Sequence, residues 1–527
     1  MVRTLFLVLA PLVVVLTGVA AWLWPPTLIV FVGVLLLTIL GYMDVVQREH
    51  TIRRNYPVVG RLRYALESIR PEIQQYFIES DTNGQPFSRE QRSIIYQRAK
   101  SVRDTVPFGT KHDVYASGYE WIGHSLAPLH APEQPPRVRI GGPDCHHPYE
   151  ASLLNVSAMS YGSLSKAAIL ALNGGAKDGG FAHNTGEGGV SPYHKKPGGD
   201  LIWQIGTGYF GCRTPEGHFD PEMFRETARL DAVKMIEIKL SQGAKPGHGG
   251  ILPASKLTRE IARIRGVKRG KDVLSPPGHA AFDSPVGLLR FVARLRELSG
   301  GKPVGFKLCV GRPVDVMALC KAMLETGVTP DFITVDGAEG GTGAAPLEFT
   351  NAVGYPLFDG LTLVHNLLVG TGLRERIKII ASGRVIDGFD MAVRVALGAD
   401  LCSSARGMMF ALGCIQALRC NSNDCPTGVA TQDPRLVRGL VVADKRERVA
   451  NYHRNTVRHF LELIAAAGCH DPRDLCSEMI HRRFDDATIH TYADLYPRIA
   501  AGSLLADEPP AIYAKEWARA SAERFVA

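Results

Sequence analysis

The most chemically distinctive stretch of the sequence holds three cysteines within twelve residues. Cys414, Cys420 and Cys425 have the spacing C-x5-C-x4-C, and Pro426 follows the last of them. Thiolates this close together can bind one inorganic centre, and iron–sulfur clusters are held by such cysteines. A zinc site needs a fourth ligand, and no other Cys or His lies close by in the sequence. We predict an iron–sulfur site, with a disulfide plus one spare thiol as the alternative.

A second group of polar side chains follows an apolar run that ends near residue 240. Lys239, Gln242 and Lys245 fall within seven residues, and together they could hold the anionic edge of a flavin and a carboxylate substrate. The alternative is a solvated loop. Lys307 lies inside another apolar run, where a buried ammonium group needs a charged partner. It is the second candidate for the flavin ring.

Three later turns are rich in glycine, and two of them also contain arginine. Gly340-Gly341, Gly383-Arg384 and Arg406-Gly407 each follow an apolar run. Glycine-rich turns at the ends of late barrel strands commonly bind phosphate. A phosphate site indicates a mononucleotide such as FMN. The cysteine segment follows the last of these turns, so we expect it close enough to deliver single electrons to a flavin.

All these groups follow short apolar runs that alternate with helical segments. Eight such runs are candidate buried strands: 153–159, 180–184, 201–205, 233–240, 304–310, 332–335, 377–381 and 400–404. Alternating strands and helices are typical of parallel βαβ units, and eight units within about 250 residues suit a (β/α)8 TIM barrel of the α/β class. A doubly wound open sheet is the alternative. The active site of a barrel lies at the carboxyl ends of its strands.

The net charge of +8 over 527 residues is modest, and no Lys/Arg tract with interleaved aromatic residues is present. We therefore expect no nucleic-acid partner. Ten cysteines occur without the regular spacing of a disulfide framework. This pattern favours a reducing compartment.

The N-terminal region is the exception to a globular composition. Residues 5–24 and 27–43 are apolar and uncharged, and Pro25-Pro26 separates them. A membrane-spanning helix needs about 20 apolar residues, so we predict a transmembrane hairpin. Arginines before and after the hairpin place both ends, and hence the catalytic domain, on the cytoplasmic side of the cell membrane. The alternative is a signal peptide cleaved near Val19-Ala20-Ala21.

The chain is thus expected to have four parts. These are a transmembrane hairpin at 1–45, a helical linker or cover at 46–139, an FMN-binding barrel with the iron–sulfur segment at 140–435, and a C-terminal helical extension at 436–527.

Taken in order, the motifs resemble the FMN-binding synthase domain of the glutamate synthase family, and the layout is similar to its stand-alone, membrane-tethered members. The resemblance covers roughly residues 140–435. It is carried by Ser157–Ser165, Asn184–Gly189, Gln204–Gly211, Glu237–Gly250, Ser275-Pro276-Pro277, Lys307, Gly340–Gly343 and Gly413–Gln432.

The resemblance implies FMN and a [3Fe–4S] cluster on the three cysteines. It also implies reduction of 2-iminoglutarate, formed from 2-oxoglutarate and ammonia, to L-glutamate. Residues carried over as FMN-binding are Ala158, Met159, Ser160, Gln204, Lys239 and Lys307, beside the glycine-rich turns. Residues carried over to the substrate are Ser160, Gln242, Lys245 and Arg265. Glu187 matches the acidic residue near the ammonia entry, and it joins Lys239 and Lys245 as a catalytic candidate.

The departures from the family pattern shape the expected partners. Residue 2 is Val rather than a catalytic cysteine, so we expect no glutamine hydrolysis. No strand-linked G-x-G-x-x-G is present, so electrons should come from a separate ferredoxin-like carrier or flavoprotein subunit. Ile251 replaces a family glutamine after Gly247-His248-Gly249-Gly250, which removes a substrate contact. This leaves two alternatives, namely an enzyme acting on a different 2-oxo acid, imine or amino acid, and a membrane-tethered electron-transfer subunit.

Overall fold

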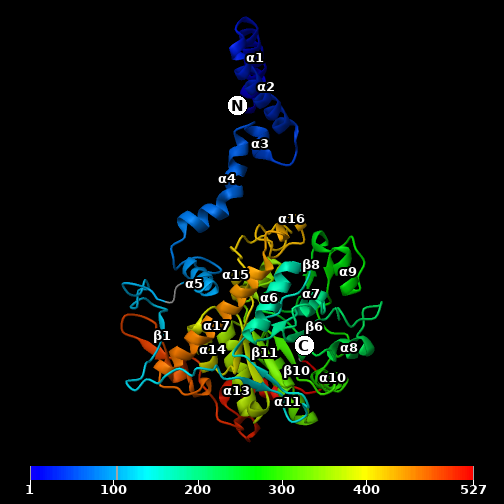
Figure 1. Ribbon diagram of the computed structural model, residues 1–527, viewed down its shortest axis with the longest axis vertical. Helices are drawn as coiled ribbons and strands as arrows, with labels where there is room; N and C mark the ends of the chain where they lie inside the picture. Colours follow the sequence, from blue (N-terminus) through cyan, green and yellow to red (C-terminus); the bar gives the residue numbers. More distant parts are fainter. Residues whose placement is uncertain (1, 103–104, 526–527) are drawn as a thin grey trace. The chain divides into compact units, whose positions relative to one another are not determined.

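The computed structural model describes residues 2–102 and 105–525. The chain divides into two compact units, Met1–Glu90 and Gln91–Ala527, each of which is described by itself (Figure 1). The structural boundary therefore lies inside the expected linker region, at residue 90.

The first unit begins with two helices that are long and apolar enough to cross a membrane. Helix α1 spans Val2–Leu23 and α2 spans Leu28–Val46, with a 3-10 turn between them. The helices pack closely where α2 has a glycine, because an ideal Cβ on Gly41 would lie 2.0 Å from the ring of Phe6. The expected hairpin is present as a structural element.

The remainder of the first unit is helical, as expected. It contains α3 (Thr51–Asn55), α4 (Gly60–Ile73) and a π-helical turn (Gln74–Ile78). Asp44 near the end of α2 is buried and pairs with Arg61 of α4 at 2.8 Å. The backbone N–H of Val58 also donates to this carboxylate, at 3.0 Å. A buried carboxylate satisfied in this way fixes the start of α4 against the end of α2.

The second unit is built on a closed barrel of eight parallel strands. The barrel order is β10-β11-β12-β13-β4-β5-β6-β7. The strands are β4 (Leu154–Val156), β5 (His183–Asn184), β6 (Leu201–Ile205), β7 (Val233–Lys239), β10 (Val304–Leu308), β11 (Phe332–Asp336), β12 (Lys378–Ser382) and β13 (Leu401–Ser404). All eight expected strands are present, and the TIM barrel is confirmed over the open sheet.

Two strands, β4 and β5, are at least three residues shorter than predicted. Gly180 is the left-handed cap of the preceding helix, with φ +65°, so it cannot belong to β5. The residues after Val156 leave the ladder and form the loop at the carboxyl end of β4. Both differences arise where the chain needs turn geometry beside the barrel rim.

Helices surround the barrel (Figure 1). They are α6 (Lys166–Gly179), α8 (Pro221–Ala228), α10 (Pro285–Leu298), α11 (Pro313–Thr326), α13 (Leu357–Gly370), α14 (Gly388–Ala396), α15 (Arg406–Ala411) and α17 (Val442–Ala466). Helices α7 (Pro192–Lys195), α9 (Arg259–Arg265), α12 (Leu347–Ala352) and α16 (Pro434–Val437) lie in the connections. Close approach of α17 to α6 needs glycine, since an ideal Cβ on Gly175 would lie 2.6 Å from Val449.

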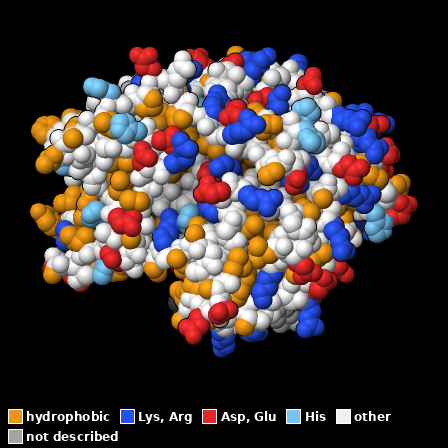
Figure 2. All heavy atoms as spheres, turned by 90° about the horizontal axis from the view of Figure 1, so that it is seen from below, with side chains coloured by type: hydrophobic (Ala, Val, Ile, Leu, Met, Phe, Trp, Pro, Cys, Tyr) orange, Lys and Arg blue, Asp and Glu red, His pale blue; other side chains and the backbone are white. Residues whose placement is uncertain are grey.

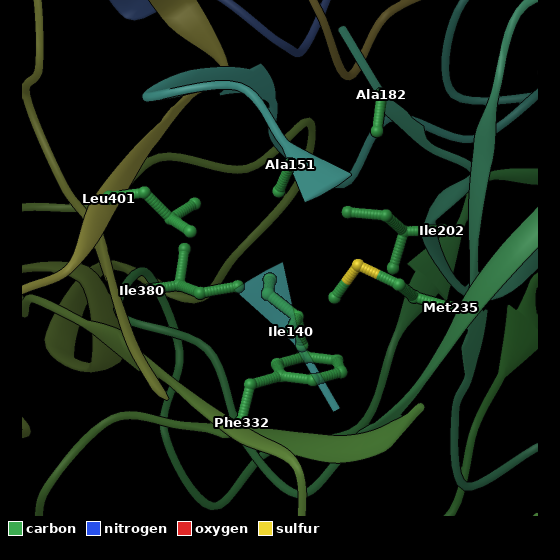
Figure 3. Close-up of a cluster of buried hydrophobic side chains, with 8 residues drawn as sticks. All are labelled: Ile140, Ala151, Ala182, Ile202, Met235, Phe332, Ile380 and Leu401. Atoms are coloured by element: carbon green, nitrogen blue, oxygen red, sulfur yellow. The ribbon is translucent and has the colours of Figure 1, made fainter. Parts of the chain in front are cut away.

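A β-hairpin closes the amino-terminal end of the barrel. Strands β2 (Val138–Ile140) and β3 (Tyr149–Ala151) pair antiparallel, and Ile140 lies at the centre of a ring of strand side chains (Figure 3). The buried cluster consists of Ile140, Ala151, Ala182, Ile202, Met235, Phe332, Ile380 and Leu401. Because this end is filled with apolar side chains, ligands must enter from the carboxyl end.

The flanking regions contain strands that the sequence did not predict. Strand β1 (Glu120–Ile122) pairs with β14 (Ile480–Arg483), which pairs with β15 (Ile489–Thr491). The C-terminal extension therefore combines helices α17, α18 (Tyr492–Leu495) and α19 (Ala511–Arg519) with a small sheet. These strands have only three or four residues, too few for a clear period-two pattern.

The molecular surface carries both signs of charge. Figure 2 shows one face on which basic and acidic side chains are interspersed, with apolar side chains scattered among them. Single exposed apolar groups are normal on protein surfaces.

Candidate functional site

A mostly buried carboxylate at the carboxyl end of the barrel is surrounded by cations. Glu187 follows β5, and its Oε1 accepts a hydrogen bond from Lys239 Nζ at the end of β7, at 2.9 Å. Burial by itself would raise the pKa of Glu187, but Lys239, Arg265 and Lys245 together lower it below its ordinary value. Glu187 is therefore ionised at neutral pH. The structure brings the three catalytic candidates together.

Arg265, the last residue of α9, reaches this group from outside the barrel strands. It is 5 % exposed, and its guanidinium lies over the ring of Phe210, 5.1 Å from the ring centroid. Its Nη2 makes only long hydrogen bonds, at 3.5 Å to Ser160 Oγ and 3.4 Å to the carbonyl of Tyr161. Its Nε has no hydrogen-bond partner among the described residues. A buried guanidinium with a spare donor is a binding group for an anion.

Lys245 is the third cation of the group. It is 2 % exposed, and its Nζ donates to the carbonyl of Ala344 at 2.8 Å. Burial, with a contribution from Lys239, lowers its pKa to about 8. Gln242 lies half-buried in the same turn, where its carbonyl accepts the Lys245 amide at 3.3 Å. These residues lie inside the protein, which excludes the alternative of a solvated loop.

Glycines leave the space that Glu187 occupies. An ideal Cβ on Gly250 would lie 2.4 Å from Glu187 Oε1, and one on Gly206 would lie 2.7 Å from the same side chain. Ile251 begins the short strand β8 (Ile251–Leu252) and is half-buried. The departure from the family pattern thus lies directly beside the glycine that touches Glu187.

A second buried carboxylate lies one layer deeper in the barrel. Glu237 accepts hydrogen bonds from Asn184 Nδ2 at 2.8 Å, Gln204 Nε2 at 2.6 Å and Thr334 Oγ1 at 2.6 Å. Sequence reasoning proposed Gln204 as a cofactor ligand and did not identify Glu237. The sequence does contain a signal for Glu237, because a carboxylate inside the apolar run of β7 requires buried hydrogen-bond partners.

Lys307 has the charged partner that its buried position requires, and this partner is Asp336 at the end of β11. The two side chains form an ion pair of 3.0 Å, and Asp336 Oδ2 also accepts the amide of Gly243 at 3.1 Å. Burial opposes the charge on Lys307, but Asp336 and Glu237 outweigh this effect and raise its pKa. Lys307 therefore carries a permanent positive charge close to the barrel mouth.

The glycine-rich turns after β11, β12 and β13 meet at one edge of the barrel mouth, and the last two contain Arg384 and Arg406. Arg406 Nη2 donates to the carbonyl of Glu339 at 2.6 Å, and an ideal Cβ on Gly341 would lie 3.1 Å from the Arg406 side chain. Burial, followed by the neighbouring charge of Arg384, lowers the pKa of Arg406 to about 10. Gly383 has φ +149° and Arg384 has φ +48°. The backbone is thus turned so that two guanidinium groups lie near each other.

The loop after β4 borders the same mouth. Met159 is buried, and its backbone N–H donates to the carbonyl of Asn184 at 3.1 Å. Ser157 Oγ lies 3.3 Å from Ser382 Oγ at the end of β12. Ala158 and Ser160 flank Met159 in this loop, and Ser160 is the residue that Arg265 touches. The loop joins the turns near Arg384 to the cations around Glu187.

The three cysteines of the 414–425 segment interact electrostatically with one another. Burial raises the pKa of Cys414 to about 12 and also raises that of Cys420. Burial opposes ionisation of Cys425 as well, but hydrogen bonds from Thr427 and backbone amides lower its pKa. All three are free thiols, so the disulfide alternative is wrong. The described residues contain no group of three side chains arranged to hold a metal ion.

Comparison with known proteins identifies the family. The model of the conserved region in glutamate synthase matches residues 145–470. The glutamate synthase large subunit-like protein YerD of Bacillus subtilis (strain 168) is 40% identical over 502 residues, covering 88% of this chain and 95% of that protein. The chain belongs to the glutamate synthase family. The expectation of a glutamate synthase-like oxidoreductase is confirmed at this level.

Other members of the family match a smaller share of the chain. The archaeal glutamate synthase [NADPH] of Methanocaldococcus jannaschii is 36% identical over 315 residues, covering 59% of this chain and 58% of that protein. This chain thus spans little more than half of that relative. A solved structure of a flavocytochrome b2 mutant with pyruvate bound aligns with TM-score 0.41 and 10% identity, covering 79% of this chain and 85% of that chain. Likeness at that level carries no argument about ligands.

Proposed function

We propose that this glutamate synthase family member reduces 2-iminoglutarate, formed from 2-oxoglutarate and ammonia, to L-glutamate. FMN and a [3Fe–4S] cluster would be its cofactors, and a separate ferredoxin-like carrier or flavoprotein subunit would supply the electrons. The observation that carries the proposal is the buried Arg265 guanidinium, whose Nε lacks a partner in the described part of the chain, beside Lys239 and Lys245.

Charge balance supports a dicarboxylate substrate. Lys239, Lys245 and Arg265 place three cationic side chains against one carboxylate, Glu187. Burying uncompensated charge is unfavourable, so an anionic ligand would stabilise this group. A 2-oxo acid with two carboxylates matches this excess of two positive charges. A pure electron carrier would need no such pocket, which favours an enzyme over an electron-transfer subunit.

The residues around the phosphate turns fit FMN. Burial, followed by the neighbouring charge of Arg384, lowers the pKa of Arg406, and a phosphate between the two guanidinium groups would offset their repulsion. Gly340, Gly341 and Gly383 would let the backbone approach a ligand closely, whereas Gly407 makes room for the hydroxyl of Tyr452. Lys239 and Lys307 would face the anionic edge of the flavin ring, with Ala158, Met159 and Ser160 against its face.

The donor set of the cysteine segment fits an iron–sulfur cluster. Soft thiolate sulfurs from Cys414, Cys420 and Cys425 are the ligands that iron–sulfur clusters use, and three of them match a cluster with three iron sites. The end of the segment is joined to the loop after β4, because Gln432 Nε2 donates to the carbonyls of Gly162 at 3.1 Å and Leu164 at 2.8 Å. This supports electron delivery toward the predicted flavin loop.

In this scheme the cofactors supply hydride transfer to the imine carbon and single-electron transfer from the donor. Arg265 and Lys245 bind and orient the two carboxylates of the substrate, and Ser160 and Gln242 adjoin them. Glu187 is ionised at neutral pH, so its carboxylate can hold ammonium and take one proton from it, which frees the nitrogen lone pair to attack the 2-oxo carbon. Loss of water from the adduct then gives the imine. Lys239 Nζ keeps Glu187 in position. Placement of these groups supplies the orientation that the reaction requires.

We also propose that α1 and α2 anchor the protein in the cell membrane, with the catalytic unit in the cytoplasm. Their length and apolar composition support this, as do the arginines that follow α2. Deletion of residues 1–45 should release the protein from membranes with its flavin retained. Membrane association of the truncated protein would show that another segment binds the membrane.

The test of the function is an anaerobic assay of chemically reduced enzyme. Flavin reoxidation should be rapid only when 2-oxoglutarate and ammonium are both present, with glutamate as the product. The proposal would be contradicted if the flavin were not reoxidised by 2-oxoglutarate, by ammonium, or by both together. Because Ile251 replaces a glutamine of the family pattern, shorter, longer and uncharged 2-oxo acids should be compared in the same assay. Faster reoxidation by one of these would favour the second candidate, an oxidoreductase for a different 2-oxo acid.

A further inference from the structure

Lys256 is a buried lysine that the proposed function does not use. It ends the 3-10 turn Ala254–Lys256, is 1 % exposed, and donates from Nζ to the carbonyl of Ser163 at 2.9 Å. Burying an ammonium group is costly unless an opposite charge compensates it. One neutral carbonyl does not supply that charge.

The side chains that interact electrostatically with Lys256 belong to the cysteine segment. Burial lowers the pKa of Lys256 to about 8, and Cys420 and Cys425, which are negative only as thiolates, act to raise it. An iron–sulfur cluster would hold these sulfurs as thiolates. The charge of Lys256 acts in turn to lower the pKa of Cys420, but burial has the larger effect and this pKa is raised overall. Among the described residues, no carboxylate contributes to the pKa shift of Lys256 or of Cys420.

Hydrogen bonds hold the lysine turn against the cysteine segment independently of charge. Asn423, between Cys420 and Cys425, donates from Nδ2 to the carbonyl of Ser255 at 3.2 Å. An ideal Cβ on Gly343 would lie 3.1 Å from Ser163 Oγ and 4.0 Å from the carbonyl oxygen of Cys420. The Ser163 loop, the lysine turn and the cysteine segment are therefore packed at one place.

The same contacts connect Lys256 to the flavin side of the site. Lys256 binds the carbonyl of Ser163, while Gln432 binds the carbonyls of Gly162 and Leu164 on either side of it. Three successive carbonyls of the loop after β4 are thus held by the cysteine segment and its adjoining turn. This places the ammonium group against the loop after β4, at the part of the loop that the cysteine segment also holds.

We propose that Lys256 is the fixed counter-charge of the iron–sulfur site and raises its reduction potential. The inference rests on the proposed function, because it requires the cluster on Cys414, Cys420 and Cys425. In the redox step the external donor loses one electron and the cluster gains it. No bond to Lys256 forms or breaks and no proton moves, so the net charge of the site becomes more negative by one unit. A neighbouring buried cation favours the more negative state.

The test compares Lys256→Gln and Lys256→Arg in the full-length protein. Glutamine keeps a donor for the Ser163 carbonyl but removes the charge, whereas arginine keeps the charge. Redox titration followed by EPR should show that Lys256→Gln lowers the equilibrium constant for one-electron reduction at least about tenfold, equivalent to ~59 mV. Lys256→Arg should restore most of this loss. Lys271→Gln removes an exposed lysine and should change the constant less than about threefold.

Iron and flavin content, measured on each variant, make the outcomes distinct. An unchanged potential in Lys256→Gln with full iron content would overturn the inference. Loss of iron from both the Gln and the Arg variant would also overturn it, since packing rather than charge would then be the role of the side chain. Loss of iron from Lys256→Gln alone would support the inference, because the cluster would then need the positive charge at this position. A wild-type protein without iron would instead overturn the cluster in the proposed function.

Discussion

The two ends of the barrel use the same strands for opposite purposes. At the amino end, Ile140 fills a ring of apolar side chains (Figure 3). At the carboxyl end, the strands carry buried charges that are paired with one another or left ready for a ligand. The change takes place along single strands. Strand β7 presents Met235, Glu237 and Lys239 in turn, and residues two apart in a strand lie on one face.

This gradient separates stability from chemistry within one element. The apolar layer stabilises the fold through burial, and the polar layer above it consists of hydrogen-bonded groups such as Glu237. The uppermost layer contains Lys239 and Asp336, which are paired at the mouth with Glu187 and Lys307. Substitutions at the two ends should therefore have different consequences, and four experiments test this separation.

The largest effect is expected for Arg265→Leu at the carboxyl end. We expect kcat/KM for 2-oxoglutarate to fall about 10³-fold, because a charged partner of a buried ligand carboxylate is lost. Flavin content should stay unchanged. The free energy of unfolding should not fall, because the arginine is a buried charge with an unpaired donor in the described structure. Arg263→Leu, at an exposed position of α9, is the control, and equal losses in both variants would refute the role of Arg265.

The matching change at the amino end is Ile140→Ala. We expect the free energy of unfolding to fall by about 2–4 kcal/mol, because the side chain is fully buried in the closed end of the barrel. Chemical denaturation measures this loss, with exposed Arg139→Ala as the control. Steady-state kcat/KM of the folded protein should be unchanged. A selective change in KM would show that the two ends are coupled.

A smaller effect is expected for Gly250→Ala. Its Cβ would meet Glu187 Oε1 at 2.4 Å, so the carboxylate must move from its position beside Lys239. We expect kcat to fall about tenfold while the unfolding free energy changes little. Gly278→Ala is the control, since an ideal Cβ there meets nothing within 4 Å. Normal turnover in Gly250→Ala would mean that the position of Glu187 does not matter.

The smallest effect is a pH dependence of substrate binding. Burial lowers the pKa of Lys245 to about 8, so its positive charge is present below pH 8 and is lost as the pH rises. The KM for 2-oxoglutarate should therefore rise up to about tenfold between pH 7 and pH 9. Lys245→Arg keeps the charge over this range and should flatten the profile. A wild-type KM that is constant with pH would exclude Lys245 as the titrating group.

Much of the barrel could be predicted from the sequence because its signals are local. Each strand is a short apolar run, and polar residues lie at or just beyond the ends of several strands, as with Lys239 and Asp336. The requirement that Lys307 have a charged partner also follows from its position in an apolar run. The family motifs then identified Arg265, which local patterning could not place, because it comes from a helix in a connection.

Other features have no local signal. The closing hairpin around Ile140 and the sheet formed by Glu120–Ile122 with Ile480–Arg483 join segments that are distant in the sequence. Short strands of this kind are defined by their partners rather than by their own periodicity. Lys256 likewise occurs in an ordinary polar turn, and only its packing against the cysteine segment gives it an electrostatic role.

The sequence by itself determined the order of strands and helices, the apolar N-terminal helices, and the residue types available for chemistry. Periodicity and residue chemistry are properties of neighbouring residues, so they can be read without coordinates. The tertiary structure decided which charges lie together: Glu187 among three cations, Asp336 beside Lys307, and Lys256 beside the cysteines. Electrostatic interactions depend on distance and burial, and both are set only when distant segments pack.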